Sequence, residues 1–209
     1  MKTAYIFHDS FSTNYADWYP WLKSTLEARG YRVIAPEFPT PAGQSLESWR
    51  VVIKNFTPSF DAETVLIGHG TGAMFALRMI EESGASIKGL MLVAPYAERI
   101  GHAGFDRVNE TFLSGDFKWE TIRERVSSIR VFAGSDDPFV PLAAMEHVAK
   151  NLGIEPEVIT DGGHFNRGSG FTQFIVLADA IRALDSMITK GLEMESVRDA
   201  QQPSELKIQ

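Results

Sequence analysis

Three stretches of the chain carry residue types that cooperate in acyl-transfer chemistry. In the stretch Thr-Val-Leu-Ile-Gly-His-Gly-Thr-Gly-Ala, Gly68 and Gly72 have the spacing of a nucleophile elbow, Gly-x-Ser-x-Gly. Asp137 and His164 follow in the order that a Ser…Asp…His triad requires. The apex of the elbow, however, is Gly70, so the attacking serine hydroxyl is missing. The sequence therefore predicts an acyl-transfer site without its nucleophile.

In such a triad, His164 is the general base, and Asp137 fixes the imidazole tautomer and stabilises the imidazolium. The frame Gly-x-x-Asp-x-x-Val-Pro favours Asp137 over its neighbour Asp136 as the partner carboxylate. Two glycines precede His164 and would let the imidazole approach the elbow. Two structural readings stay open: Asp137 could cap the helix that begins near Pro141, and His164 could be an ordinary loop histidine.

An oxyanion hole would use backbone N–H groups at the same place. Thr71 follows the elbow apex at the start of a helix, and a second donor would come from Asp9 or Ser10 in the loop after the first strand. One preorganised donor of this kind is typically worth about 3 kcal/mol. The Asp9 carboxylate would oppose developing negative charge unless it points away from the site.

Another nucleophile could replace the missing serine. The hydroxyls of Thr71, Ser10 and Ser12 are the nearest in sequence, but no motif directs them at His164. A water retained beside Gly70 and deprotonated by His164 is a further option. The elbow apex is strained and glycine relieves that strain, so natural loss of the serine and its engineered removal both explain Gly70.

Composition limits the class of protein. The chain has 209 residues, 44% hydrophobic and 22% charged, as expected for one globular domain. A net charge of −7 argues against a nucleic-acid partner, and no apolar run reaches the roughly 18 residues that span a membrane. The apolar run at the N-terminus is too short for a signal peptide, so we expect a cytoplasmic protein. With no cysteine, disulfides, thiolate nucleophiles and cysteine-based zinc sites are excluded.

Short apolar runs alternate with amphipathic stretches, which predicts β-α units and a mainly parallel sheet. Strands are expected at residues 3–7, 31–35, 64–67, 89–93, 129–133 and 157–160, and helices at about 18–30, after Ser45, and at 73–82, 143–152 and 171–188. Gly70, Asp137 and His164 each follow a predicted strand. Because ligands bind beyond the carboxyl ends of parallel strands, we expect these residues at one edge of the sheet.

The β-α rhythm also predicts the domain organisation. Residues 1–191 form one domain, within which residues 96–127 break the rhythm and are expected to form a small cap over the site. The segment 192–209 is polar and is expected to be a flexible tail.

The chain resembles the small serine hydrolases of the YdeN and retinoblastoma-binding-protein-nine kind, which are compact members of the α/β-hydrolase superfamily. The resemblance covers residues 1 to about 188 and is carried by Tyr-Ile-Phe-His from Tyr5, Trp-Tyr-Pro-Trp-Leu-Lys from Trp18, Gly-His-Gly-Thr-Gly-Ala from Gly68, Asp-Asp-Pro-Phe-Val-Pro from Asp136 and Gly-Gly-His-Phe from Gly162. It implies an α/β-hydrolase-like three-layer sandwich, with a mainly parallel sheet of about six strands and helices on both faces.

The resemblance also implies a function and its residues. The family pattern has serine at position 70, aspartate at 137 and histidine at 164, and members with a His-Gly turn after the first strand have glycine where this chain has Asp9. The implied substrates are carboxylic esters or related acyl compounds. The alternative is an inactive pseudoenzyme that binds an acyl ligand or a protein partner through the retained cleft.

No cofactor and no metal are expected. Gly-x-Gly-x-x-Ala from Gly68 matches a dinucleotide-binding fingerprint, but it follows the third strand rather than the first and lacks the acidic residue that should end the next strand. His8, Asp9, His69 and His164 could in principle hold a metal, although no metal-binding spacing supports that reading.

Overall fold

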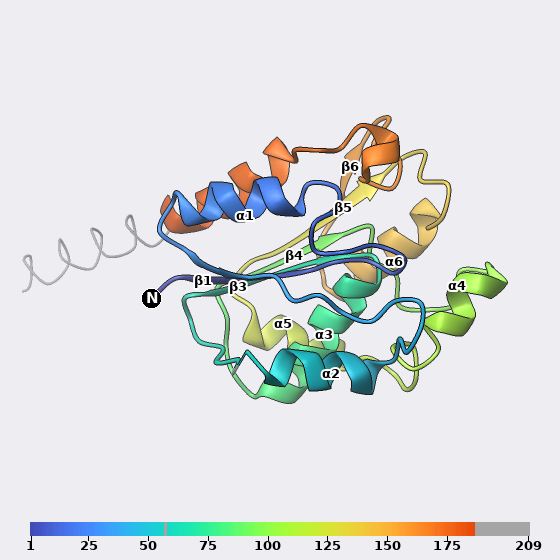
Figure 1. The fold of residues 1–209 in the computed structure, drawn as a ribbon, viewed down its shortest axis with the longest axis horizontal. Coiled ribbons are helices and arrows are strands. Elements are labelled where there is room, and N and C mark those ends of the chain that lie inside the picture. The colour runs from blue at the N-terminus through green and yellow to red at the C-terminus, as the bar shows by residue number, and fades with distance from the viewer. Residues whose placement is uncertain (57, 187–209) are drawn as a thin grey trace, which may run out of the picture.

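The computed structural model describes residues 1–56 and 58–186. Six parallel strands form one sheet in the order β2-β1-β3-β4-β5-β6 (Figure 1). The strands are β1 (Thr3–Phe7), β2 (Arg32–Ile34), β3 (Thr64–His69), β4 (Gly89–Val93), β5 (Ile129–Gly134) and β6 (Glu157–Ile159).

Helices cover both faces of this sheet (Figure 1). One face carries α1 (Tyr19–Glu27) and the helical residues 175–186, and the other carries α2 (Leu46–Lys54), α3 (Thr71–Ser83) and α5 (Trp119–Arg125). Helix α6 (Leu142–Asn151) packs against β5. The predicted α/β-hydrolase-like three-layer sandwich is confirmed.

The central strands and α2 follow directly from the sequence. All residues of β3 and β4 are buried, as their unbroken apolar runs require in a sheet covered on both faces. Ser45 caps α2 by accepting a hydrogen bond from the backbone N–H of Ser48, whose hydroxyl accepts in turn from the Ser45 N–H. Phe56 lies beyond the end of this helix and is 39% exposed.

The last helix begins later than predicted. Its expected start, Phe171, instead follows a 3-10 turn at Arg167–Ser169 and packs its ring against Phe165 and Phe174. Gly170 has a φ of 86° and ends that turn, so α-helix begins only at residue 175. The predicted end of the helix and the predicted tail at 192–209 lie outside the described residues.

The expected cap at 96–127 is divided between two roles. Helix α4 (Ala103–Val108) lies near the carboxyl edge of the sheet, where the Phe105 ring contacts Phe11 and Phe139. Helix α5 instead packs against α3 and buries Ile122, so the second half belongs to the helical layer. This placement has a physical reason, because the crossover between the parallel strands β4 and β5 is usually a helix packed on the sheet.

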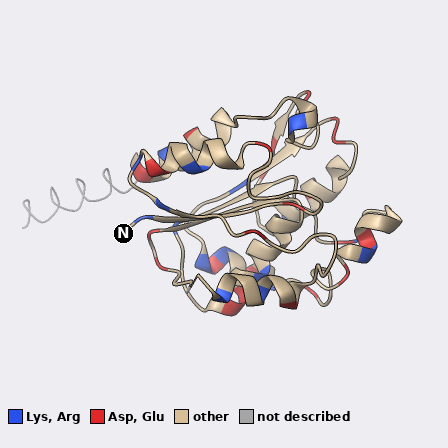
Figure 2. Ribbon diagram, in the orientation of Figure 1, with Lys and Arg blue, Asp and Glu red and all other residues tan. Residues whose placement is uncertain are grey.

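Charged side chains lie mainly on the outer helices and loops, and the strands are mostly uncharged (Figure 2). Both signs are interspersed on the lower helical layer in this view. Within the described residues, no helix combines the length and the apolar character needed to cross a membrane.

The end of β1 and the start of α3 approach each other at backbone distance. A Cβ atom added to Gly72 would overlap the carbonyl oxygens of Phe7 and His8, and one added to Gly68 would overlap the carbonyl of Gly72. The two outer glycines of the elbow are therefore required by packing, whatever residue stands at the apex.

We expect Gly72→Ala to destabilise the fold, because its new methyl group would meet backbone atoms that cannot rotate away. Overpacking of this kind costs about 1–3 kcal/mol, and each kcal/mol lowers the Tm of a domain this size by about 2–4 °C. Gly104→Ala, in α4, is the matched control, because its added Cβ would meet only the His102 ring at ordinary contact distance. Thermal unfolding of both variants tests this; equal Tm values would contradict the close approach.

Candidate active site

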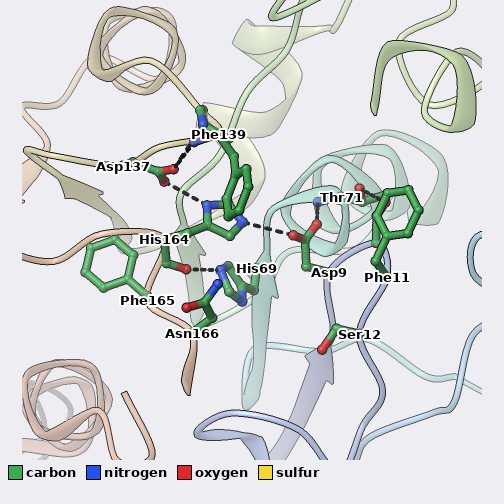
Figure 3. Close-up of polar contacts among 12 residues, drawn as sticks. Asp9, Phe11, Ser12, His69, Thr71, Asp137, Phe139, His164, Phe165 and Asn166 are labelled. Carbon is green, nitrogen blue, oxygen red and sulfur yellow. Dashed lines mark hydrogen bonds and ion pairs between the residues drawn. The ribbon is translucent and has the colours of Figure 1, made fainter. Parts of the chain in front are cut away.

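The residues predicted to do chemistry meet at the carboxyl edge of the sheet (Figure 3). Gly70 follows β3, Asp137 lies in the loop after β5, and His164 lies in the loop after β6. A fourth residue, Asp9, comes from the loop after β1 and points its carboxylate into the same place.

Gly70 has the backbone of a nucleophile elbow, with φ 52° and ψ −114°. Its N–H donates to the carbonyl oxygen of Val93 (2.9 Å), and α3 starts at the next residue. A positive φ of this kind favours glycine and strains other residues. A Cβ atom added here would overlap the Asp9 carboxylate, so residues 9 and 70 share one volume.

His164 is paired with Asp137 rather than with Asp136. Nδ1 of His164 lies 2.7 Å from Oδ2 of Asp137, while the other oxygen of Asp137 accepts from the N–H groups of Phe139 (2.8 Å) and Val140 (3.0 Å). Asp137 thus organises its own loop with one oxygen and orients the imidazole with the other. Asp136 has a separate task, since it accepts from the N–H of Gly163 (2.8 Å) and so holds the turn that precedes His164.

The carboxylate of Asp9 bridges the other two functional groups of the site. Its Oδ2 lies 2.9 Å from Nε2 of His164, and its Oδ1 accepts a 2.7 Å hydrogen bond from the N–H of Thr71 (Figure 3). The Thr71 N–H, which was predicted to bind an oxyanion, is therefore already hydrogen-bonded to the Asp9 carboxylate. The Asp9 carboxylate does not point away from the site, because a buried carboxylate needs compensating donors and finds them at the start of α3 and on His164.

The backbone N–H of Asp9, the other predicted oxyanion donor, is also directed elsewhere. It donates to the Tyr19 hydroxyl (3.3 Å), which lies 2.7 Å from Nδ1 of His69; Nε2 of His69 lies 2.8 Å from the carbonyl oxygen of His164. This chain of hydrogen bonds connects the backbones of Asp9 and His164 through two buried side chains. Sequence reasoning missed this role of Tyr19 and His69, because nothing local indicates the contact.

His8 fixes the direction in which Asp9 leaves β1. Its Nε2 accepts from the N–H of Phe38 (2.9 Å), so its protonated Nδ1 donates to the carbonyl oxygen of Asp9 (2.8 Å). Burial lowers the pKa of His8, which keeps the ring neutral and this tautomer in place.

The hydroxyls considered as replacement nucleophiles are bonded to groups other than His164. Ser10 Oγ and Thr71 Oγ1 lie 2.6 Å apart, and each lies within hydrogen-bond distance of Oδ1 of Asn109, at 3.1 and 2.8 Å. Ser12 donates to Asp17 (3.4 Å). Ser10 and Thr71 thus act as a buried polar connection between the first loop, α3 and the segment after α4.

Electrostatics make His164 an imidazolium. Burial alone would lower its pKa, but the hydrogen bonds and negative charges of Asp137 and Asp9 raise the pKa of His164 to about 10. Burial alone would raise the pKa of Asp9, but the bond to His164, its positive charge and the Thr71 N–H lower it to about 2. At neutral pH the site therefore holds a cation between two carboxylates, and a protonated His164 cannot accept a proton as a general base.

The hydrogen bonds of His69 oppose metal binding at this site. Asp9, His69 and His164 do present ligand atoms within 4.8 Å of one another. However, burial and then the positive charge of His164 lower the pKa of His69 to about 4, and both of its ring nitrogens already bond the Tyr19 hydroxyl and a backbone carbonyl. The lone pair that a metal would need is directed at Tyr19.

A cleft of about 390 Å³ opens above these residues. Asp9, His69 and His164 lie at its base, and the aromatic rings of Phe11, Phe105 and Phe139 line it. An apolar wall with a few polar groups at the base is typical of a small-molecule site.

Comparison with known proteins places this chain in a family. A sequence profile described as serine hydrolase matches residues 6–182. The chain belongs to the serine hydrolase family. The serine hydrolase RBBP9 of Rattus norvegicus is 31% identical over 176 residues, which cover 84% of this chain and 88% of RBBP9.

A second relative is the putative hydrolase YdeN of Bacillus subtilis. It is 26% identical to this chain over 191 residues, which cover 90% of this chain and 99% of YdeN. The crystal structure of the ydeN gene product matches 89% of this chain with a TM-score of 0.82. Est1E of Butyrivibrio proteoclasticus, solved with ferulic acid bound, is only 11% identical but matches 92% of this chain with a TM-score of 0.63. That likeness shows the shared α/β-hydrolase-like fold.

We expect His164 to keep its proton well above its ordinary pKa of about 6.5. The stabilisation from this proton is fully present below pH 6.5 and is lost as the pH rises through about 10. Asp9, Asp137 and the His69 ring, 4.8 Å away, are the titratable groups that face it. NMR titration should show His164 still protonated at pH 8, and Asp9→Asn should lower its midpoint. A midpoint near 6.5 in the wild-type chain would contradict the ion pair.

A second expectation concerns the volume shared by residues 9 and 70. Gly70→Ala should destabilise the fold, because backbone strain of about 1–3 kcal/mol adds to the displacement of the Asp9 carboxylate. In an Asp9→Gly background the displacement is absent and only the strain remains. Thermal or urea unfolding of the two single variants and the double variant gives the coupling free energy between positions 9 and 70. If the changes in unfolding free energy of the single variants simply add up in the double variant, the two positions do not compete for space.

Proposed function

We propose that this chain is a serine-hydrolase-family protein in which an Asp9–His164 ion pair has replaced the serine–histidine pair, so that it forms no serine acyl-enzyme. The observation that carries the proposal is the Asp9 carboxylate, which fills the space above Gly70 and bonds both His164 and the Thr71 N–H. The family relationship and the esterase-like neighbours support acyl hydrolysis as the chemistry from which the site derives.

Each step of acyl transfer is opposed by this arrangement. No hydroxyl stands at position 70, His164 already holds a proton, and the Thr71 N–H is bonded to a carboxylate. Hydrolysis by a water beside Gly70 is opposed as well, because the Asp9 carboxylate occupies the space that the water would need. Loss of a triad member alone leaves only about 10³–10⁴-fold acceleration over water, so ester hydrolysis should be weak at most.

The retained cleft supports a second candidate, an inactive protein that binds a small acyl or ester ligand. Aromatic side chains line the cleft, its base presents the Asp9–His164 ion pair beside Asp137, and the carboxylate of Asp17 also lines it. Such a lining disfavours an anionic ligand and suits an apolar ligand of modest size.

The geometry also bears on the origin of Gly70. If the serine had simply been removed from a working site, residue 9 would have no reason to fill the empty space. A carboxylate from a second position does fill it, with matched hydrogen bonds on both oxygens. This coordinated change supports natural loss rather than engineered removal.

We expect two substitutions together to restore ester hydrolysis where neither suffices alone. Gly70→Ser leaves the Asp9 carboxylate in the way, and Asp9→Gly leaves no nucleophile. Asp9→Gly with Gly70→Ser would free the Thr71 N–H and leave His164 with one carboxylate partner. The double variant should hydrolyse p-nitrophenyl acetate and react with a fluorophosphonate probe, at least about 100-fold above either single variant.

The control is His164→Ala in the double variant, which should abolish both signals. Ester hydrolysis by the wild-type chain that depends on His164 would overturn the proposal. A folded double variant without activity would show that the site has lost more than its serine.

A further inference from the structure

We propose that the retained cleft binds a small arylalkylammonium ion, whose ammonium group pairs with Asp17 and whose aromatic ring lies against the phenylalanine wall of the cleft. The inference rests on the part of the proposed function in which the cleft is kept as a binding site. It assigns that cleft a cationic ligand in place of an acyl one, and it does not depend on the loss of acyl transfer.

One wall of the cleft is a continuous row of aromatic rings. The ring centroids of Phe11 and Phe105 lie 5.2 Å apart, and those of Phe105 and Phe139 lie 5.7 Å apart. The row continues to the imidazole of His164, 5.2 Å from the Phe139 ring. Phe11 is 53% exposed and Phe139 is 39% exposed, so an apolar group of a ligand would bury ring surface that the fold leaves in water.

The backbone holds two lining residues in a conformation that folding alone does not favour. Phe11 has a φ of 58° and Asp17 a φ of 50°, in the left-handed region that glycine adopts without strain. For a bulky residue such as Phe11 this is a true outlier, and its N–H is held by a 2.7 Å hydrogen bond to the Thr40 hydroxyl. Strained residues that line a cleft are typical of functional sites. The strain at Phe11 therefore supports a use for its ring in the cleft.

The charges around the cleft favour a cation. Two carboxylates line it, those of Asp9 and Asp17, and one cationic ring, that of His164. The carboxylate of Asp137 stands behind this ring and bonds its Nδ1. Among the described residues that line the cleft, none is a lysine or an arginine. The negative groups thus outnumber the positive one, which opposes an anion and attracts a cation.

Asp17 is the carboxylate that is free to receive an ammonium group. Asp9 and Asp137 are each paired with His164, whereas Asp17 forms no ion pair with any described residue. One oxygen of Asp17 accepts a 2.7 Å hydrogen bond from the Arg167 N–H, and the other accepts a long one, 3.4 Å, from the Ser12 hydroxyl.

These two hydrogen bonds leave acceptor capacity on Asp17. An ionised carboxylate can accept about four hydrogen bonds, so there is room for the N–H donors of a primary ammonium. A charge-assisted hydrogen bond of this kind is stronger than a neutral one. The cleft volume of about 390 Å³ limits the ligand to a small molecule, such as one ring on a short chain that ends in the ammonium group.

The experiment compares three probes of similar size and different charge: 2-phenylethylammonium, 2-phenylethanol and phenylacetate. NMR titration of the backbone amide signals gives the Kd of each probe and the place where it binds. We expect the ammonium to bind at least about 10-fold more tightly than the alcohol, because its hydrogen bond to Asp17 is charge-assisted. Phenylacetate should bind most weakly, and the signals of Phe11, Asp17 and Phe105 should move with the ammonium.

Two variants separate the role of the carboxylate from that of the rings. Asp17→Asn keeps an oxygen acceptor and tolerates the same backbone conformation, so it should remove the preference for the ammonium and leave the Kd of the alcohol unchanged. Phe11→Gly should weaken the ammonium and the alcohol to a similar extent, because it removes the apolar contact that both share. Since glycine also relieves the strain at this position, a loss of affinity there cannot be ascribed to strain in the fold.

Asp161→Asn is the matched control for the change in charge. Asp161 also has a positive φ, 55°, but it is exposed and does not line the cleft, so the three Kd values should not change. The inference is overturned if no probe binds, if the alcohol or phenylacetate binds as tightly as the ammonium, or if Asp161→Asn weakens ammonium binding as much as Asp17→Asn. Should that happen while Asp9→Gly with Gly70→Ser gains esterase activity, the proposed function stands and only the assignment of the ligand fails.

Discussion

The close approach of the end of β1 to the start of α3 governs the rest of the site. Gly72 has no side chain, so the carbonyls of Phe7 and His8 pass directly against the first turn of α3. That contact brings the side chain of residue 9 into the space that a side chain at residue 70 would occupy. One of the two positions can fill the space, and in this chain it is position 9.

Filling the space with a carboxylate changes the electrostatics of the site. A buried charge must be compensated, and Asp9 obtains a helix N-terminal N–H and the His164 ring. In return, a second carboxylate raises the pKa of His164 and keeps its proton in place. A hydroxyl in the same space would leave the histidine free to act as a base. The exchange of one functional group therefore reverses the role of His164 from proton acceptor to proton donor.

The parts of this structure that were predictable from sequence are those with local signals. The apolar run of β3, the glycines around Gly70 and the loop that holds Asp137 each carry a pattern that refers only to nearby residues. The orientation of Asp9 carries none, because it depends on the distance between β1 and α3 and on a histidine 155 residues away. The same holds for Tyr19 and His69, whose contacts cross between elements. The site residues could be named from the sequence, but not the direction in which one of them points.

The shared volume also limits how such a site can change. Serine at 70 beside a carboxylate at 9 would overfill the space, because even a Cβ atom at 70 overlaps Asp9. Glycine at both positions would leave a void at the base of the cleft and only one carboxylate on the imidazole. Two combinations put a single side chain in this space and give His164 a hydrogen-bond partner: glycine at 9 with serine at 70, and aspartate at 9 with glycine at 70. Positions 9 and 70 therefore act as one unit, and the chemistry of this site is decided by the pair rather than by the missing serine alone.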